Sequence, residues 1–155
     1  MRIFAALLLL GLASEGWADE FFFDSQFSSQ DIRAVEVILR DDAKGACWTN
    51  LKEVREYAEE KFRANRIPLL TDTNIRLSVN QEYNYVVQVF GNRTFEDGSG
   101  PCSGFISITL LNYVRINNRV HVAVAGQLVN GYLGVGSNLN REVIKAVQYT
   151  FESLN

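Results

Sequence analysis

The sequence contains a single histidine, His121, and only two cysteines, Cys47 and Cys102, and this scarcity limits the chemistry that it can support. A protein metal site usually needs three or four nitrogen, sulfur or oxygen ligands at close spacing. No second histidine exists, and neither carboxylates nor cysteines are spaced around His121 as metal ligands. We therefore expect no metal site and no cofactor.

Clustered basic residues are also missing. The chain has 15 Lys and Arg against 18 Asp and Glu, for a formal net charge of −3. Binding to nucleic acid needs a basic face or stripe. We therefore expect no nucleic-acid partner.

Long apolar runs are missing after the N-terminus, and a membrane helix needs about 20 such residues. The run at 3–12 is shorter, follows Arg2, and is followed by Gly16-Trp17-Ala18, with small residues at the usual cleavage positions before Asp19. This pattern is typical of a secretory signal peptide. We expect a signal peptide at 1–18, cleavage near Ala18, and a periplasmic or secreted protein that does not span a membrane.

In an exported chain, two cysteines are most simply one disulfide. A bond between Cys47 and Cys102 closes a loop of about 55 residues, which corresponds to about 4 kcal/mol in the chain-entropy treatment. The pairing predicts a clamp between the start of a helix and a strand.

Residues 19–31, "DEFFFDSQFSSQD", are aromatic without a period, and we interpret them as an N-terminal arm. The adjacent aromatic residues Phe21–Phe23 either cover part of the domain or meet a partner, because such a patch is rarely left in water. The sequence does not decide whether this arm is ordered.

Periodicity predicts the elements of one domain at 32–155. Alternation at 34–39 indicates a strand. Asn50, with Glu53 in capping-box position, starts a helix that ends before Pro68.

From 74 to 136 the period is two, which predicts strands. Asn117 and Asn118 form a credible hairpin turn. Ser137 or Asn138 starts a last helix. The strands are expected within 75–90, 105–116 and 120–128.

The resulting order is β-α-β-β-β-α. Hairpin-length links make the later strand pairs antiparallel, and two amphipathic helices can cover one sheet face. We predict an α+β two-layer sandwich with a mostly antiparallel sheet and both helices on one face.

One sheet face is expected to meet the helices and the other to remain open. The long strand places Ile106, Ile108 and Leu110 inward, and alternation in the next strand predicts that Val120, Val122, Val124 and Leu128 are also inward. The opposite face then offers a candidate binding surface of aromatic and polar side chains: Phe105, Thr109, Tyr113 and His121. Such a surface suits a protein, a glycan or self-association. The alternative is that the N-terminal arm covers it.

Three short stretches suggest catalysis. "PCSGF" and "HVAVAG" resemble the nucleophile and histidine segments of the NlpC/P60 cell-wall peptidases, which implies Cys102 as nucleophile and His121 as base. The cysteine opens a helix in that family, whereas the period at 105–116 predicts a strand. "ACW" at Cys47 resembles the papain-like arrangement, in which a helix N-terminus activates a thiol.

The stretch "CWTNLKEVREYAEEKFRANRI" resembles the first helix of small exported bacterial proteins of unknown function. Asn92-Arg93-Thr94 fits the N-glycosylation pattern, and we expect it in an exposed loop. Our principal hypothesis is an exported, non-catalytic binding or envelope-accessory module whose partner is a protein or envelope component. A thiol peptidase or amidase acting on cell-wall peptides through Cys102 and His121 is the alternative.

Overall fold

The computed structural model describes residue 21 and residues 28–72 and 82–154. The expected signal peptide, most of the N-terminal arm and the first part, 75–81, of the strand expected within 75–90 lie outside this range. The described elements are β1 (Ala34–Ala43), α1 (Leu51–Ala64), β2 (Glu82–Arg93), β3 (Cys102–Ile116), β4 (Arg119–Tyr132) and α2 (Asn140–Glu152), with short 3-10 turns at Ser29–Asp31 and Leu70–Asp72. The predicted order β-α-β-β-β-α is confirmed.

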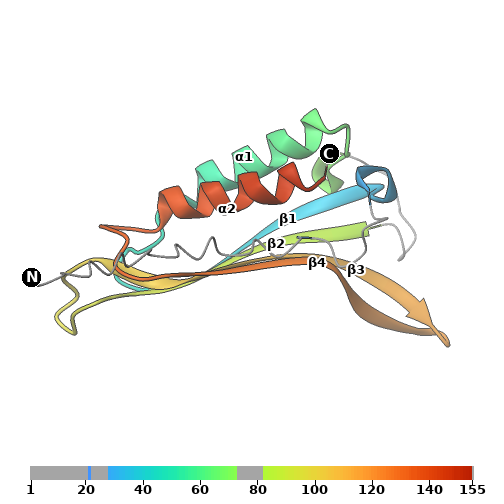
Figure 1. Ribbon diagram of the computed structural model, residues 1–155. Coiled ribbons are helices and arrows are strands. Elements are labelled where there is room, and N and C mark those ends of the chain that lie inside the picture. Colours follow the sequence, from blue (N-terminus) through green and yellow to red (C-terminus); the bar gives the residue numbers. More distant parts are fainter. Residues whose placement is uncertain (1–20, 22–27, 73–81, 155) are drawn as a thin grey trace, which may run out of the picture.

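The four strands form one mixed sheet in the order β1-β2-β3-β4. β1 and β2 are parallel, because the chain returns through α1 between them, while the later pairs are antiparallel. Both helices lie on the same face of the sheet (Figure 1). The predicted α+β two-layer architecture is therefore confirmed.

The core lies between the helices and this covered face. Tyr85, Ile106 and Ile108 are almost completely buried on the strands. Phe62 of α1 packs edge-on against Tyr85, with ring centroids 5.1 Å apart, and against Phe151 of α2 at 4.7 Å. Aromatic burial of this kind fixes both helices on the sheet.

The helix starts differ in detail from the sequence prediction. Asn50 is the N-cap of α1, but its side chain does not cap the helix. Its Oδ1 accepts a hydrogen bond from Trp48 Nε1 at 3.0 Å, and its Nδ2 donates to Glu53 Oε2 at 2.9 Å. The tryptophan has therefore replaced the backbone as the partner of Asn50. α2 is capped at Leu139, later than Ser137 or Asn138.

β3 and β4 form a long hairpin closed by Asn117 and Asn118, whose φ values are 50° and 62°. Two consecutive positive φ values are what a two-residue hairpin turn needs, so this turn prediction is confirmed. The end of the hairpin projects beyond the helices (Figure 1). All residues from Arg115 to Val122 are accordingly exposed.

An irregularity in this hairpin changes the face of the sheet on which alternate side chains of β4 lie. Leu110 pairs with Gly126, but Leu111 pairs with Val124, so Ala125 is an extra residue in β4. Such a bulge shifts the alternation by one residue. The prediction that Val120, Val122 and Val124 lie on the same inward face as Leu128 is therefore wrong.

Phe21 lies at the outer edge of β4. Its carbonyl oxygen accepts a hydrogen bond from Gln127 N at 2.8 Å, and its side chain is 1% exposed. This residue of the arm therefore belongs to the domain core, while Phe22 and Phe23 lie outside the described residues. No helix in the described part of the chain has the length and apolar character needed to cross a membrane.

Candidate functional site

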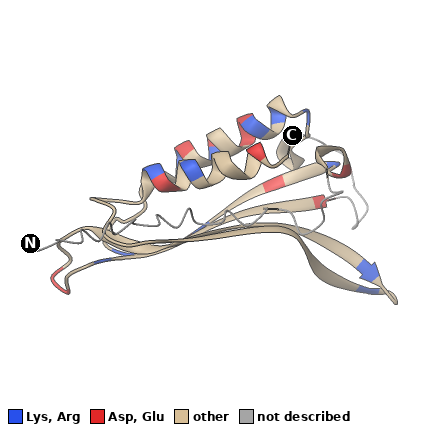
Figure 2. Cartoon of the chain, viewed as in Figure 1, with Lys and Arg blue, Asp and Glu red and all other residues tan. Residues whose placement is uncertain are grey.

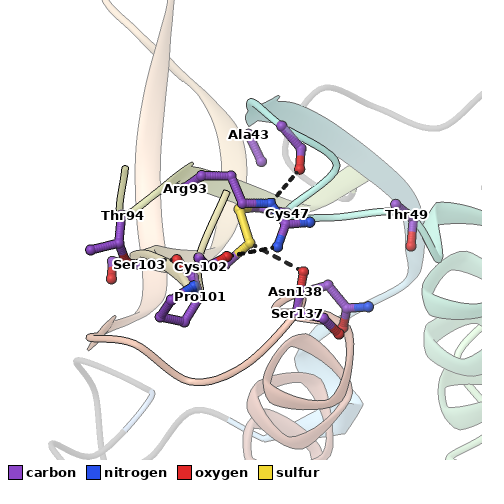
Figure 3. Close-up of a disulfide and its surroundings, with 12 residues drawn as sticks. Ala43, Cys47, Thr49, Arg93, Thr94, Pro101, Cys102, Ser103, Ser137 and Asn138 are labelled. Carbon is purple, nitrogen blue, oxygen red and sulfur yellow. Dashed lines mark hydrogen bonds between the residues drawn. A yellow bond between two sulfur atoms is a disulfide. The ribbon is translucent and has the colours of Figure 1, made fainter. Parts of the chain in front are cut away.

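Cys47 and Cys102 form a disulfide with an S–S distance of 1.98 Å and a Cα–Cα distance of 5.7 Å. Figure 3 shows this bond and the residues around it. Both cysteines are fully buried. The predicted pairing is confirmed. A thiolate is the nucleophilic form of cysteine, so neither residue is a nucleophile in this oxidised state.

The disulfide lies at a junction of three chain segments. Leu139 N, at the start of α2, donates to Cys47 O at 2.7 Å, and Cys102 N donates to Gly136 O at 2.8 Å. Beside them, Asn140 Oδ1 accepts from Thr49 N at 3.0 Å. The disulfide thus ties the turn before α1 to β3. The two backbone hydrogen bonds attach the segment that precedes α2 to the same junction.

His121 lies far from this junction. It pairs with Val114, whereas Cys102 is the first residue of the same strand, β3. Twelve residues of strand at about 3.4 Å each place them about 40 Å apart. A general base must lie within hydrogen-bond reach of its nucleophile. Cys102 and His121 therefore do not form a catalytic dyad in this fold.

We use the name open face for the side of the sheet that neither of the described helices, α1 and α2, covers. Phe105, Thr109 and Tyr113 of β3 lie on it, because they alternate with the buried Ile106, Ile108 and Leu110. His121 does not join them. Its partner Val114 is adjacent to Tyr113 in the strand, so His121 lies on the opposite side of the hairpin.

Sequence reasoning missed three residues of the open face. Val120, Val122 and Val124, which we call the valine stripe, pair with Arg115, Tyr113 and Leu111 and so share their face. Their exposed fractions are 53%, 58% and 45%. The bulge at Ala125 places these three valines on the open face. The alternation of apolar and polar residues in the sequence does not reveal a bulge.

Polar and aromatic contacts support the rest of this face. Asn84 Nδ2 of β2 donates to Tyr113 Oη at 3.1 Å. Toward the disulfide end, the rings of Phe90 and Phe105 stack at a centroid distance of 4.4 Å. The open face therefore combines ordered aromatic side chains with the exposed valine stripe.

Charge is distributed unevenly around this face. Between Cys102 and Tyr132 the only Lys, Arg, Asp or Glu residues are Arg115 and Arg119. Both lie near the end of the hairpin, whereas acidic and basic residues alternate along the helices (Figure 2). The hairpin surface thus carries no Lys, Arg, Asp or Glu along most of its length and is cationic only at its end.

The buried titratable groups have structural roles. Burial raises the pKa of the Tyr85 hydroxyl, whose partner is Thr150 Oγ1 at 2.6 Å. Because Thr150 Oγ1 donates to Val147 O at 2.8 Å, Tyr85 is the donor of the first bond. This pair joins α2 to the sheet and faces no opening.

Other parts of the surface offer weaker candidates. A hollow of about 180 Å³ lies between the ends of the helices and is lined by Lys61, Ala64, Asn65, Gln148, Phe151 and Glu152. Asn92 is exposed, but it lies in strand β2. The prediction that it lies in a loop is therefore wrong.

No family model matches the chain, and no curated protein matches it.

Proposed function

We propose that this chain is an exported, non-catalytic binding module of the cell envelope or of the secreted fraction. Its partner, a protein or another envelope component, contacts the open face along β3 and β4. The observation that carries the proposal is the valine stripe, which exposes three β-branched side chains in a row.

Exposed apolar side chains and a low density of charge support a binding surface at this position. Exposed apolar patches on folded domains commonly mark interaction sites. Burial of apolar surface contributes about 25 cal/mol per Å², so covering the half-exposed valines stabilises a complex. Charge is depleted along the hairpin, as it is at the centres of protein interfaces.

Export is supported by the disulfide, because such bonds persist in oxidising compartments. Cleavage near Ala18 and a periplasmic or secreted destination complete the proposal. Sequencing the N-terminus of the protein recovered outside the cytoplasm tests this part. A protein that begins at Asp19 agrees with it, and a protein that retains Met1 in the cytoplasm contradicts it.

A pair of matched variants tests the binding face. Val122→Asp places a charge at the centre of the valine stripe, whereas Ile116→Asp changes a residue of similar exposure, 53%, on the other side of the same hairpin. Both variants are expected to fold, because both positions face solvent. In affinity capture from envelope extract, wild type and Ile116→Asp are expected to retain the partner and Val122→Asp to lose it. Equal capture by all three would count against the proposal.

A further inference from the structure

Among the described residues, the outer edge of β4 has backbone groups next to the valine stripe that no neighbouring strand pairs. Ile116 and Arg119 flank the two-residue turn and form the first hydrogen-bonded pair of the hairpin. Antiparallel pairs alternate between bonded and non-bonded, so the N–H and C=O groups of Val120, Val122 and Val124 point away from β3. Within the described residues these groups meet no other strand, because β4 is the last strand of the sheet.

The sequence of this edge is nearly symmetric about one residue. Val120 and Val124 lie two positions on either side of Val122. An antiparallel copy centred on Val122 would place valine opposite valine, because each Val120 would then meet a Val124. His121 would meet Ala123, and Arg119 would meet Ala125. A two-fold interface requires this self-complementarity.

We propose that the segment Val120–Val124 pairs with the same segment of a second copy of this chain. The two sheets then form one continuous eight-stranded sheet, and the two valine stripes lie side by side on the same face. The backbone hydrogen bonds set the alignment, and cross-strand valine pairs add stabilisation.

Electrostatics allow this arrangement. No carboxylate or like charge faces Arg119 across the pair. The two Arg119 residues are about six residues apart along the strands, or about 20 Å, which exceeds the screening length of about 8 Å at physiological salt. The bulge at Ala125 and the hydrogen bond from Gln127 to Phe21 end the available edge on the other side.

The inference goes beyond the proposed function, because it uses the edge of the hairpin and leaves the open face available to another partner. Each proposal can therefore fail alone. Cross-linking tests the dimer with purified protein, whereas capture from extract tests the face.

Single cysteines report the alignment directly, since the native cysteines are buried in their own disulfide. In a pair centred on Val122 the two Cα atoms lie about 5.5 Å apart, within the range that a disulfide spans. Val122→Cys is therefore expected to form a covalent dimer on mild oxidation. Two Val120→Cys chains would be about 14 Å apart and are expected to form no disulfide with each other. Mixing Val120→Cys with Val124→Cys should give the heterodimer.

A second variant checks the backbone pairing. Val122→Pro removes an N–H that points away from β3, so the hairpin is expected to remain folded by circular dichroism. Wild type should show a concentration-dependent dimer in analytical ultracentrifugation, and Val122→Pro should sediment as a monomer. If wild type is monomeric at all concentrations, or if Val122→Cys cross-links no better than Val120→Cys, the proposed dimer is overturned.

Discussion

Val122 lies directly opposite Tyr113 in the ladder between β3 and β4, so their side chains share the open face. Tyr113 is held by Asn84, while Val122 remains 58% exposed. The pair joins an ordered aromatic residue to an apolar one that no described helix or strand covers. The proposed function depends on this pairing. Val122 lies on the same face as Tyr113 only because of the one-residue bulge at Ala125.

Removal of the disulfide is expected to lower the free energy of unfolding substantially. The bond between Cys47 and Cys102 closes a 55-residue separation, for which the loop-entropy treatment gives about 4 kcal/mol. The double variant Cys47→Ala/Cys102→Ala should show this loss in urea denaturation. Wild type in reducing agent should show a similar loss and the variant no further change. Free thiols in the denatured, unreduced wild type would contradict the assignment.

Removal of the buried hydroxyl of Tyr85 and removal of that of Thr150 should lower the free energy of unfolding by unequal amounts. Tyr85→Phe removes one donor and leaves Thr150 bonded to Val147, so we expect a loss of about 1 kcal/mol. Thr150→Val leaves the Tyr85 hydroxyl buried without its acceptor and should cost about 2 kcal/mol. In thermal unfolding, the double variant should lose less stability than the two single variants lose together. Strict additivity would contradict the hydrogen bond.

Gly104 lies where β2 and β3 approach too closely for a side chain. A Cβ atom there would clash with Phe90 O and would lie 2.7 Å from Gly91 Cα. We expect Gly104→Ala to lose about 2–3 kcal/mol, because the backbones must separate. Gly131 of β4 has no atom within 4 Å of the equivalent position, so Gly131→Ala should change stability by less than about 0.5 kcal/mol. Equal effects in chemical denaturation would contradict this packing.

Glu142 should make the stability depend on pH in the acid range. Burial acts to raise the pKa of its carboxyl, but hydrogen bonds and charge from Arg141 and Lys145 outweigh burial and lower the pKa below 4.5. A lowered folded-state pKa stabilises the protein above the unfolded value, and this contribution is lost as pH falls through the folded value. Both cations are exposed, so Glu142→Gln should lose only about 0.5–1 kcal/mol at neutral pH. Wild type and variant should converge as the pH falls below the folded-state pKa of Glu142; a constant difference would contradict this electrostatic role.

Local rules predicted the parts of the fold that depend on neighbouring residues. The Asn117-Asn118 turn and the extent of α1 follow from turn chemistry and helical spacing, and the disulfide follows from cysteine count in an exported chain. The sequence could not predict which side chains of β4 face the helices. Alternation assigns side chains to faces only along a strand in which no residue is inserted. Ala125 inserts one, so the valine stripe moves to the open face and His121 leaves it.

The approach of distant segments was also outside the reach of sequence patterns. Periodicity does not report that Phe21 reaches the edge of β4 or that Leu139 N bonds to Cys47 O. Nor could the resemblance at Cys102 and His121 reveal that the two residues lie at opposite ends of one hairpin. These relationships depend on strand register, which is set by the whole sheet.

The most direct measurement is site-specific photo-cross-linking in living cells, with a benzoylphenylalanine at position 122 or at position 116. Val122 and Ile116 have similar exposure, 58% and 53%, and lie on opposite sides of the same hairpin. If the open face is the binding surface, the probe at 122 forms a covalent adduct with another envelope component and the probe at 116 does not. Adducts of equal yield at both positions, or none at 122, would contradict the proposed function.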